Sequence, residues 1–310
     1  MSRLHQGGKR GLTRAAGAAL DAGAGALVTA VLKSARLAPR RGMADGLGLA
    51  LRKAGPWLGE HRIGRANLAA AFPEKSPPEI ERILAGVWDN LGRVTAEFAH
   101  IERLTYSDPP CAEDDISAEP EIFERFRRFR AEGKPTLVFA AHLANWELPA
   151  LIAARFGIEA ATLFRRPNIR SVADAVVDIR ANAMGKLVPT GLDAPVRLLR
   201  ELQEGRSVAM LVDQHFAKGV DVTFFGRRCK ANPLIAQLAR HVECPIRGTR
   251  IVRKADKHSF LADLTEPIAP ARDAEGRIDI AGTMQAITSV VEGWVREHPE
   301  QWLWLHRRWR

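Results

Sequence analysis

The chain has 310 residues, of which 46% are hydrophobic, and it carries a formal net charge of +10 at pH 7. This hydrophobic content is enough to bury a full core, which argues against a disordered chain. The length suits one domain of about 250 residues with an N-terminal appendage, or two domains. The positive charge indicates an anionic partner, for which nucleic acid, an acidic membrane surface and a phosphorylated substrate are candidates. Cys111, Cys229 and Cys244 lack metal-ligand spacing, so we expect neither a disulfide framework nor a zinc site.

The first 41 residues are strongly basic. They contain eight Lys and Arg residues but only one acidic residue, Asp21, and the basic groups flank the small and apolar stretch Ala15 to Leu32. This pattern favours a helix lying at a membrane interface, held by anionic head groups. A membrane-spanning helix remains an alternative, although the stretch has fewer than the roughly 20 apolar residues that a bilayer requires. Because positive charge continues over 33–41, we expect retention on the cytoplasmic side rather than a cleaved signal peptide.

Residues 42–119 are predicted to form a helical region. Apolar residues recur at three- and four-residue intervals over 44–58, 63–71 and 78–104, which is the helical period. The sequence Ser76-Pro-Pro-Glu79 predicts a helix start, since it offers a hydroxyl cap, a proline in the first turn and an early carboxylate. An acidic loop is expected over 109–120.

Residues 120–310 are predicted to form an α/β core, because short apolar runs alternate with helical patterns. The expected fold is a mixed central sheet flanked by helices. The predicted strands are 136–141, 159–164, 186–189, 207–212, 245–253 and 259–263. The predicted helices are 120–131, 146–156, 170–183, 194–204, 234–241 and 284–297. Residues 219–226 are expected to form a turn and an aromatic strand.

His142 follows the buried strand 136–141 and precedes a helix that contains Glu147. In open α/β sheets ligands bind in the crevice beyond the carboxyl ends of the strands, so His142 is placed to meet a substrate. A carboxylate from the next helix can reach the ring and fix its tautomer. The other nitrogen can then remove a proton from an alcohol that attacks an ester or thioester. The bland alternative is a histidine that merely caps the turn, because this spacing also arises by chance.

A second histidine shares this spacing, but His258 and Asp263 fall in a segment expected to be a strand, where positions five apart face opposite ways. We therefore expect a structural role for His258. Two other predicted strands end in polar residues. Arg165 and Arg166 follow one and could bind phosphate, and Asp213 follows another and could orient an arginine or a substrate hydroxyl, or cap a turn. His215 is a weaker candidate for a base.

The C-terminal sequence Pro299-Glu-Gln-Trp-Leu-Trp-Leu-His-Arg-Arg-Trp309 combines three tryptophans with arginines. Such a segment could stack single-stranded nucleic acid. It could equally anchor the chain at a membrane interface, where indole rings lie among head groups.

Four blocks of sequence resemble the lysophospholipid-type acyltransferases, and within them the lipid A late acyltransferases of lipopolysaccharide assembly. They are Asn67-Leu-Ala-Ala-Ala-Phe-Pro-Glu74, His142 to Glu147, Asp213-Gln214 through Phe224-Phe225-Gly226, and Pro299 to Trp309. The resemblance covers roughly 60–310 and implies a glycerolipid acyltransferase-like core. The chain departs from the family pattern at Cys229-Lys-Ala-Asn-Pro233 and in its weakly hydrophobic N-terminal segment.

The resemblance implies that His142 is the general base and that Glu147 is its partner. It places Arg166, Arg180 and Asp213 at the family's other functional polar positions. Together with the neighbouring Arg165, Asn168 and Gln214, these residues form the expected substrate-binding set. No metal or redox cofactor is implied.

The implied reaction transfers a fatty acyl chain from an acyl carrier protein thioester to the hydroxyl of a 3-hydroxyacyl chain on a phosphorylated lipid A precursor. The expected location is the cytoplasmic face of the bacterial inner membrane, with membrane lipids but not nucleic acid as partners. A glycerolipid or ornithine-lipid acceptor remains an alternative. The length of the acyl chain, the hydroxyl that is acylated and the oligomeric state stay open.

Overall fold

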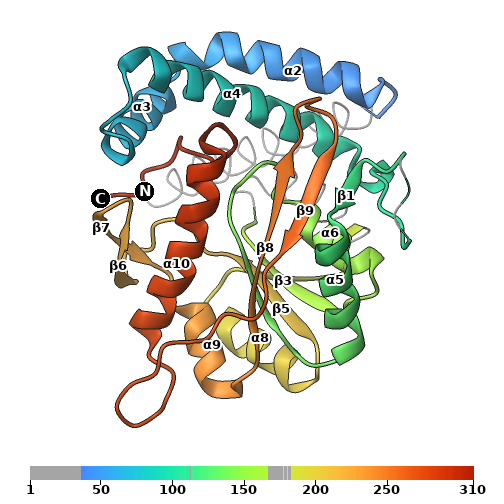
Figure 1. Cartoon of the computed structure of the whole chain (residues 1–310), viewed down its shortest axis with the longest axis vertical. Helices are drawn as coiled ribbons and strands as arrows, with labels where there is room; N and C mark the ends of the chain where they lie inside the picture. Colours follow the sequence, from blue (N-terminus) through green and yellow to red (C-terminus); the bar gives the residue numbers. More distant parts are fainter. Residues whose placement is uncertain (1–35, 110, 112, 167–176, 178–179, 181–182) are drawn as a thin grey trace, which may run out of the picture.

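The structure is a computed structural model that describes residues 36–310, apart from 110, 112, 167–176, 178–179 and 181–182. The described residues form a seven-stranded sheet in the order β1-β9-β8-β2-β5-β3-β4 (Figure 1). Its strands are β1 (Ile116–Ala118), β2 (Leu137–Ala140), β3 (Ala160–Phe164), β4 (Lys186–Pro189), β5 (Ser207–Leu211), β8 (Ile246–Arg253) and β9 (Phe260–Leu264). Neighbouring strands run parallel except β8 and β9, so the mixed sheet predicted from the sequence is confirmed.

Helices surround this sheet. Their bounds are α2 (Arg40–Ala54), α3 (Gly59–Ala71), α4 (Pro77–Ala99), α5 (Pro120–Glu132), α6 (Leu148–Arg155), α8 (Ala194–Gln203), α9 (Leu234–Val242) and α10 (Ile280–Glu297), with short 3-10 turns η1 (Gly55–Trp57), η2 (Ile101–Arg103) and η3 (Pro299–Gln301). The start of α4 is the predicted one, because Ser76 N donates to Glu79 Oε2 at 2.8 Å in a capping box.

The central strand β2 is buried on both faces, which explains its continuous apolar run. Successive side chains of a strand point to opposite faces. Leu137 and Phe139 accordingly pack in one apolar cluster with α8, α9 and α10, whereas Val138 packs in a second cluster with α5 and α6. The sheet therefore lies between two helical layers.

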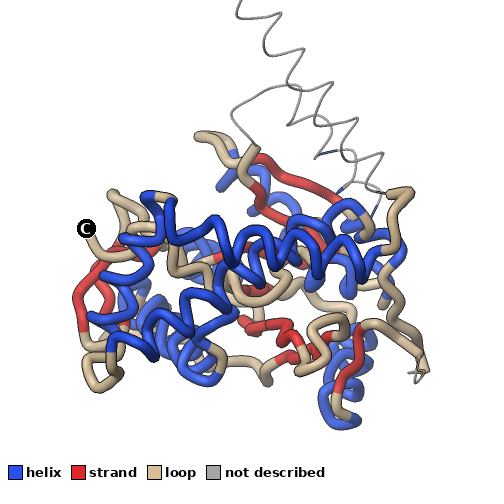
Figure 2. Tube along the Cα trace, turned by 90° about the horizontal axis from the view of Figure 1, so that it is seen from above, coloured by secondary structure: helices blue, strands red, loops and turns tan. Residues whose placement is uncertain are grey.

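Helix α4 lies across one end of the sheet, and α2 packs along its outer side (Figures 1 and 2). The position of α4 matters for the site, because its buried polar residues Asn90 and Glu97 contact the loop that follows β2. The helical region predicted between 42 and 119 thus contributes directly to the end of the sheet where polar residues gather.

Two strands were not predicted. β1 is a three-residue edge strand inside the expected acidic loop, and β7 (Arg227–Ala231) pairs with β6 (Val220–Phe224) in an antiparallel hairpin. Phe225 and Gly226 join β6 to β7 with φ of 52° and 68°, the left-handed conformation that such tight hairpin turns require. The predicted helix 170–183 lies mostly outside the described residues.

The predicted membrane-associating segment 1–41 also falls largely outside the described residues, since the description begins at residue 36. Among the helices that are described, none has both the length and the apolar character needed to cross a bilayer.

Candidate active site

The register of β2 and β5 brings His142 and Asp213 together. Ala140 of β2 pairs with Leu211 of β5, and both chains continue for two residues in step to His142 and Asp213. The Asp213 carboxylate consequently accepts two hydrogen bonds from one residue. His142 Nδ1 lies 2.8 Å from Asp213 Oδ1, and the backbone N–H of His142 donates to Asp213 Oδ2 at 2.9 Å. The carboxylate therefore fixes both the ring and the backbone of His142.

This contact defines the tautomer of the imidazole. An ionised carboxylate can only accept, so His142 Nδ1 carries the proton that faces Asp213 and Nε2 is left as an acceptor. The side-chain amide of Gln214 lies beside that nitrogen, with Nε2 to Nε2 at 3.3 Å. The His142 side chain is 14% exposed and that of Asp213 is fully buried. The arrangement leaves Nε2 as the basic nitrogen of the ring.

Electrostatics favour a strong base at this position. Burial alone would lower the pKa of His142, but the charge and hydrogen bond of Asp213 outweigh it, so the pKa is raised above its ordinary value. Burial pushes the pKa of Asp213 upward, yet the neighbouring His142 holds it well below its usual range. Asp213 is thus ionised and is placed to stabilise an imidazolium at His142.

The hydrogen-bond partner of His142 Nδ1 is Asp213 and not the predicted Glu147. Glu147, at the N-terminal end of α6, accepts from Arg180, with Arg180 Nε at 2.8 Å from Oε2. A catalytic role for Glu147 stays a prediction. The charge of Glu147 still raises the pKa of His142, and Arg180 lowers it. Asp213 was expected to orient an arginine or a hydroxyl, whereas Glu147 pairs with the arginine and Asp213 orients the histidine.

The loop between His142 and α6 is held by buried polar contacts. Ala144 adopts φ of 46°, a left-handed conformation that costs energy for a residue with a side chain. Asn90 Nδ2 donates to the carbonyl of Ala144 at 3.1 Å, and Asn145 Nδ2 donates to Glu97 Oε2 at 2.9 Å. Glu97 also receives both terminal nitrogens of the buried Arg253. This network of residues from α4 and β8 holds the strained loop in place.

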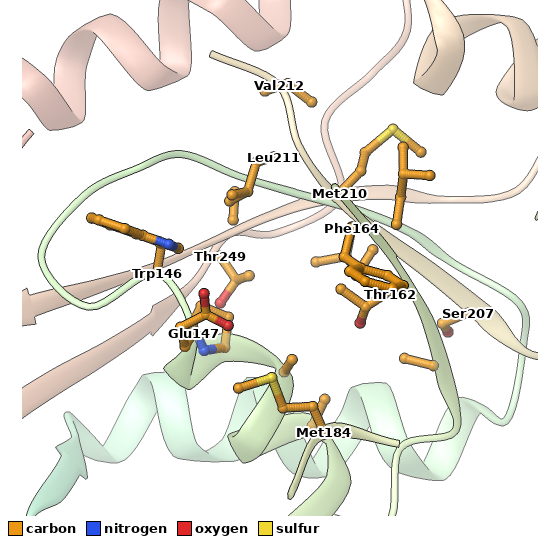
Figure 3. Close-up of a pocket in the computed structure, with 18 of the residues that line it drawn as sticks. Trp146, Glu147, Thr162, Phe164, Met184, Ser207, Met210, Leu211, Val212 and Thr249 are labelled. Atoms are coloured by element: carbon orange, nitrogen blue, oxygen red, sulfur yellow. The ribbon is translucent and has the colours of Figure 1, made fainter. Parts of the chain in front are cut away.

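An apolar cavity of about 590 Å³ opens beside His142, a size typical of small-molecule sites. Figure 3 shows Glu147 and Trp146 at one side of the cavity and Ser207 at the other, with Thr162 and Met184 between or below them. Aliphatic and aromatic side chains supply most of its wall, from β3, β5, α5 and α6. The cavity can hold an alkyl chain with one end at the basic nitrogen.

The remaining predicted binding residues are placed as follows. Arg165 lines the cavity, and both Arg165 and the neighbouring Arg166 are exposed. Asn168 lies outside the described residues. His215 lines the cavity as well. His258 lies in a turn before β9, not in the expected strand, with Nε2 at 3.4 Å from Asp45 Oδ2, which agrees with a structural role.

Two residues of the site were not predicted from the sequence. Trp302 donates its indole N–H to Asp213 Oδ2 at 2.8 Å, and Asn145 joins the loop to Glu97. Both Trp302 and Trp304 are completely buried, so the C-terminal motif offers neither ring as a platform for nucleic acid or as a membrane anchor. A signal for Asn145 was available, since the side chain stands inside the His142 to Glu147 block.

In the part of the chain that the structure describes, no three His, Cys, Asp or Glu side chains gather as metal ligands would. The absence of a metal or redox cofactor remains a prediction from the resemblance.

A histidine and carboxylate pair at the strand ends of an α/β sheet, opening onto an apolar cavity, is chemically suited to the transfer of an apolar acyl group. The model of the bacterial lipid A biosynthesis acyltransferases matches residues 19–310, and the chain belongs to this family. The family resemblance predicted from the four sequence blocks is thereby confirmed. A comparison with curated proteins finds no match to this chain.

Proposed function

We propose that the protein transfers a fatty acyl chain from an acyl carrier protein thioester to the hydroxyl of a 3-hydroxyacyl chain on a phosphorylated lipid A precursor. The single observation that supports this reaction best is the His142–Asp213 pair at the mouth of the apolar cavity. Family membership favours the lipid A precursor as acceptor.

In the proposed mechanism, His142 Nε2 removes the proton from the acceptor hydroxyl while its oxygen attacks the thioester carbonyl. Asp213 accepts the Nδ1 hydrogen bond throughout and stabilises the imidazolium. When the tetrahedral intermediate collapses, the carbon–sulfur bond breaks and the imidazolium returns its proton to the departing thiolate. The products are an ester and the free thiol of the carrier, and His142 is neutral again. We propose that the acceptor hydroxyl binds where the Gln214 amide lies in this structure, beside His142 Nε2.

The cavity is proposed to hold the acyl chain of the donor. β5 lines it from Ser207 to Leu211, which spans about 13 Å along the strand at about 3.3 Å per residue. A chain lying along β5 would place its thioester at the His142 end and its methyl end near Ser207. Each buried methylene contributes about 0.8 kcal/mol, so the apolar wall favours a long saturated chain.

Positively charged groups near the mouth are proposed to meet the anionic partners. The guanidiniums of Arg165 and Arg166 are exposed beyond the end of β3, where they can bind the phosphates of the acceptor. The net charge of +10 would also attract an acidic carrier protein and speed its encounter. An anionic lipid and an acidic carrier protein would therefore account for the positive charge without a nucleic-acid partner.

Contact with the membrane is proposed to involve the outer side of α2 and the turn that follows it. Leu49, Trp57 and Leu58 are exposed by 52%, 86% and 45%, and the basic residues Arg52 and Lys53 lie in the last turn of α2. Exposed apolar side chains beside cations suit an interface of acyl chains and anionic head groups. This surface would add to the basic N-terminal segment.

The reaction is tested with a panel of acyl carrier protein thioesters, from short to very long chains, offered with a tetra-acylated lipid A precursor. We expect one ester product that carries the donor chain. If no donor yields product with this acceptor, lysoglycerolipid and ornithine-lipid acceptors are tried with the same donors. Transfer to one of those alone would replace the proposed acceptor.

A further inference from the structure

The C-terminal motif is built into the active site. Leu143 and Trp302 form an antiparallel bridge, and the backbone N–H of Leu303 donates to the carbonyl of His142 at 3.1 Å. Ala144 N donates in turn to the carbonyl of Gln301 at 2.9 Å. The segment Gln301 to Leu303 therefore runs alongside the loop that carries His142 and holds its backbone on both sides of Leu143.

The side chain of Trp302 reaches Asp213 through the same arrangement. Its Nε1 donates to Asp213 Oδ2 at 2.8 Å, and this oxygen also accepts from the backbone N–H of His142. The indole is wedged edge-on between Phe224 and Trp304, with ring centroids at 5.6 and 4.7 Å. A fully buried, packed indole has one orientation, so it fixes the plane of the carboxylate.

The chemistry of this contact is directional. An indole nitrogen can only donate, and hydrogen bonds to charged groups are stronger than neutral ones. The donor draws electron density from Asp213, which moderates the pull of this carboxylate on the His142 proton. The contact thus acts on the base through a second residue, without reaching the substrate.

We propose that Trp302 is a positioning residue that sets the orientation of Asp213 and, through it, the proton affinity of His142. The proposal rests on the proposed function, in which His142 is the base. It assigns to the tryptophan-rich end of the chain a part in the acyl-transfer site.

The test is a matched pair of variants, Trp302→Phe and Trp304→Phe. Trp304 is equally buried and donates its own indole N–H at 2.7 Å, but to the carbonyl of Pro299. Both variants therefore lose one buried indole donor and a similar volume. Acyl transfer is measured as kcat and KM across pH, with thermal unfolding as the check on folding.

For Trp302→Phe we expect kcat to fall roughly ten- to hundredfold with little change in KM. The acidic limb of the profile should move to higher pH, because the backbone N–H of His142 still holds Asp213 while the carboxylate attracts the proton more strongly. Trp304→Phe should lose stability but keep the limb of the wild type. A downward move in Trp302→Phe would overturn the proposal, because it contradicts the moderating effect of the indole. Equal losses in both variants, with unmoved limbs, would overturn it as well.

A second measurement needs neither substrate nor Trp302→Phe. The indole ¹⁵N–¹H resonances of full-length Trp146→Phe protein are followed across the titration of His142. This background removes the indole that packs against the His142 ring at 5.3 Å. One indole resonance should titrate with His142 and lose that step when His142→Ala is added. A step from His306, whose ring centroid lies 5.2 Å from that of Trp302, should remain. If no indole resonance responds, Trp302 is not coupled to the base. Because this readout is independent of acyl transfer, it separates failure of this proposal from failure of the proposed function.

Discussion

Asp213 lies 2.8 Å from Nδ1 of His142 because two parallel strands end in register. The pairing of Ala140 with Leu211 places the two residues at equal distances beyond β2 and β5. The acid of the pair therefore comes from a neighbouring strand that is remote in sequence, and not from the helix that follows the histidine. Sheet register, rather than local spacing, decides which carboxylate orients the base.

Replacing Asp213 with asparagine should keep the shape of the site but remove the charge that raises the pKa of His142. We expect kcat to fall about 100- to 10,000-fold, as for other oriented histidine bases. Only neutral His142 can accept a proton, so activity declines as pH falls through its pKa. The wild type should therefore show an acidic limb above about 6.5, the ordinary value for histidine, and Asp213→Asn should shift it to lower pH. An unmoved limb in the folded variant would contradict this role of Asp213.

Removal of Glu147 should act through Arg180. Glu147→Ala leaves that guanidinium unpaired near the imidazole, where its charge opposes protonation of His142. We expect a loss of roughly a hundredfold in kcat/KM, with a smaller downward shift of the acidic limb than in Asp213→Asn. A double variant with Arg180→Met should lose less than the sum of the two single effects. Additive losses would show that the two residues act independently.

Strand ends were predictable from the sequence, and the network beneath them was not. The apolar runs at 137–140 and 207–211 mark strands that end near polar residues, and this placed His142 and Asp213 at one edge of the sheet. Their pairing could not be predicted, because strand order and register depend on contacts between distant segments. For the same reason the local spacing pointed to Glu147, whereas Asp213 is the carboxylate at His142 Nδ1 and Glu147 pairs with Arg180.

The C-terminal segment illustrates the same limit. Its alternation of tryptophan and arginine predicted an exposed binding surface, yet Trp302 and Arg308 are buried by packing against the β6–β7 hairpin. That hairpin includes β7, which was not predicted because Arg227–Ala231 is largely polar and short. Nothing local distinguishes a buried tryptophan-rich tail from an exposed one.

The deep end of the cavity should set the length of the donor chain. Ala160 lies opposite Ser207 at the start of β3 and lines the cavity. Ala160→Phe would fill that end, so we expect transfer of the longest accepted donor to fall at least tenfold while the shortest keeps its rate within about threefold. Glu159→Phe is the matched control, since it adds the same ring at the exposed neighbouring position. Equal loss with every donor would argue against a chain lying along β5.

Membrane contact through the turn after α2 should depend on Trp57. Trp57→Ser removes an 86% exposed indole, and we expect about tenfold weaker binding of the full-length protein to anionic vesicles in co-sedimentation. Leu192 provides the control because it is fully exposed at a distant position before α8. Leu192→Ser should bind as the wild type does. Unchanged binding by Trp57→Ser would leave the N-terminal segment as the anchor and exclude this surface.

The most direct measurement compares wild type with His142→Ala in transfer of a labelled acyl chain from acyl carrier protein to the tetra-acylated lipid A precursor. Circular dichroism and thermal unfolding establish that the variant is folded. We predict product from the wild type and none above background from His142→Ala, because His142 Nε2 takes up the hydroxyl proton in the proposed mechanism. Substantial turnover by the folded His142→Ala protein would contradict the assignment of His142 as the catalytic base.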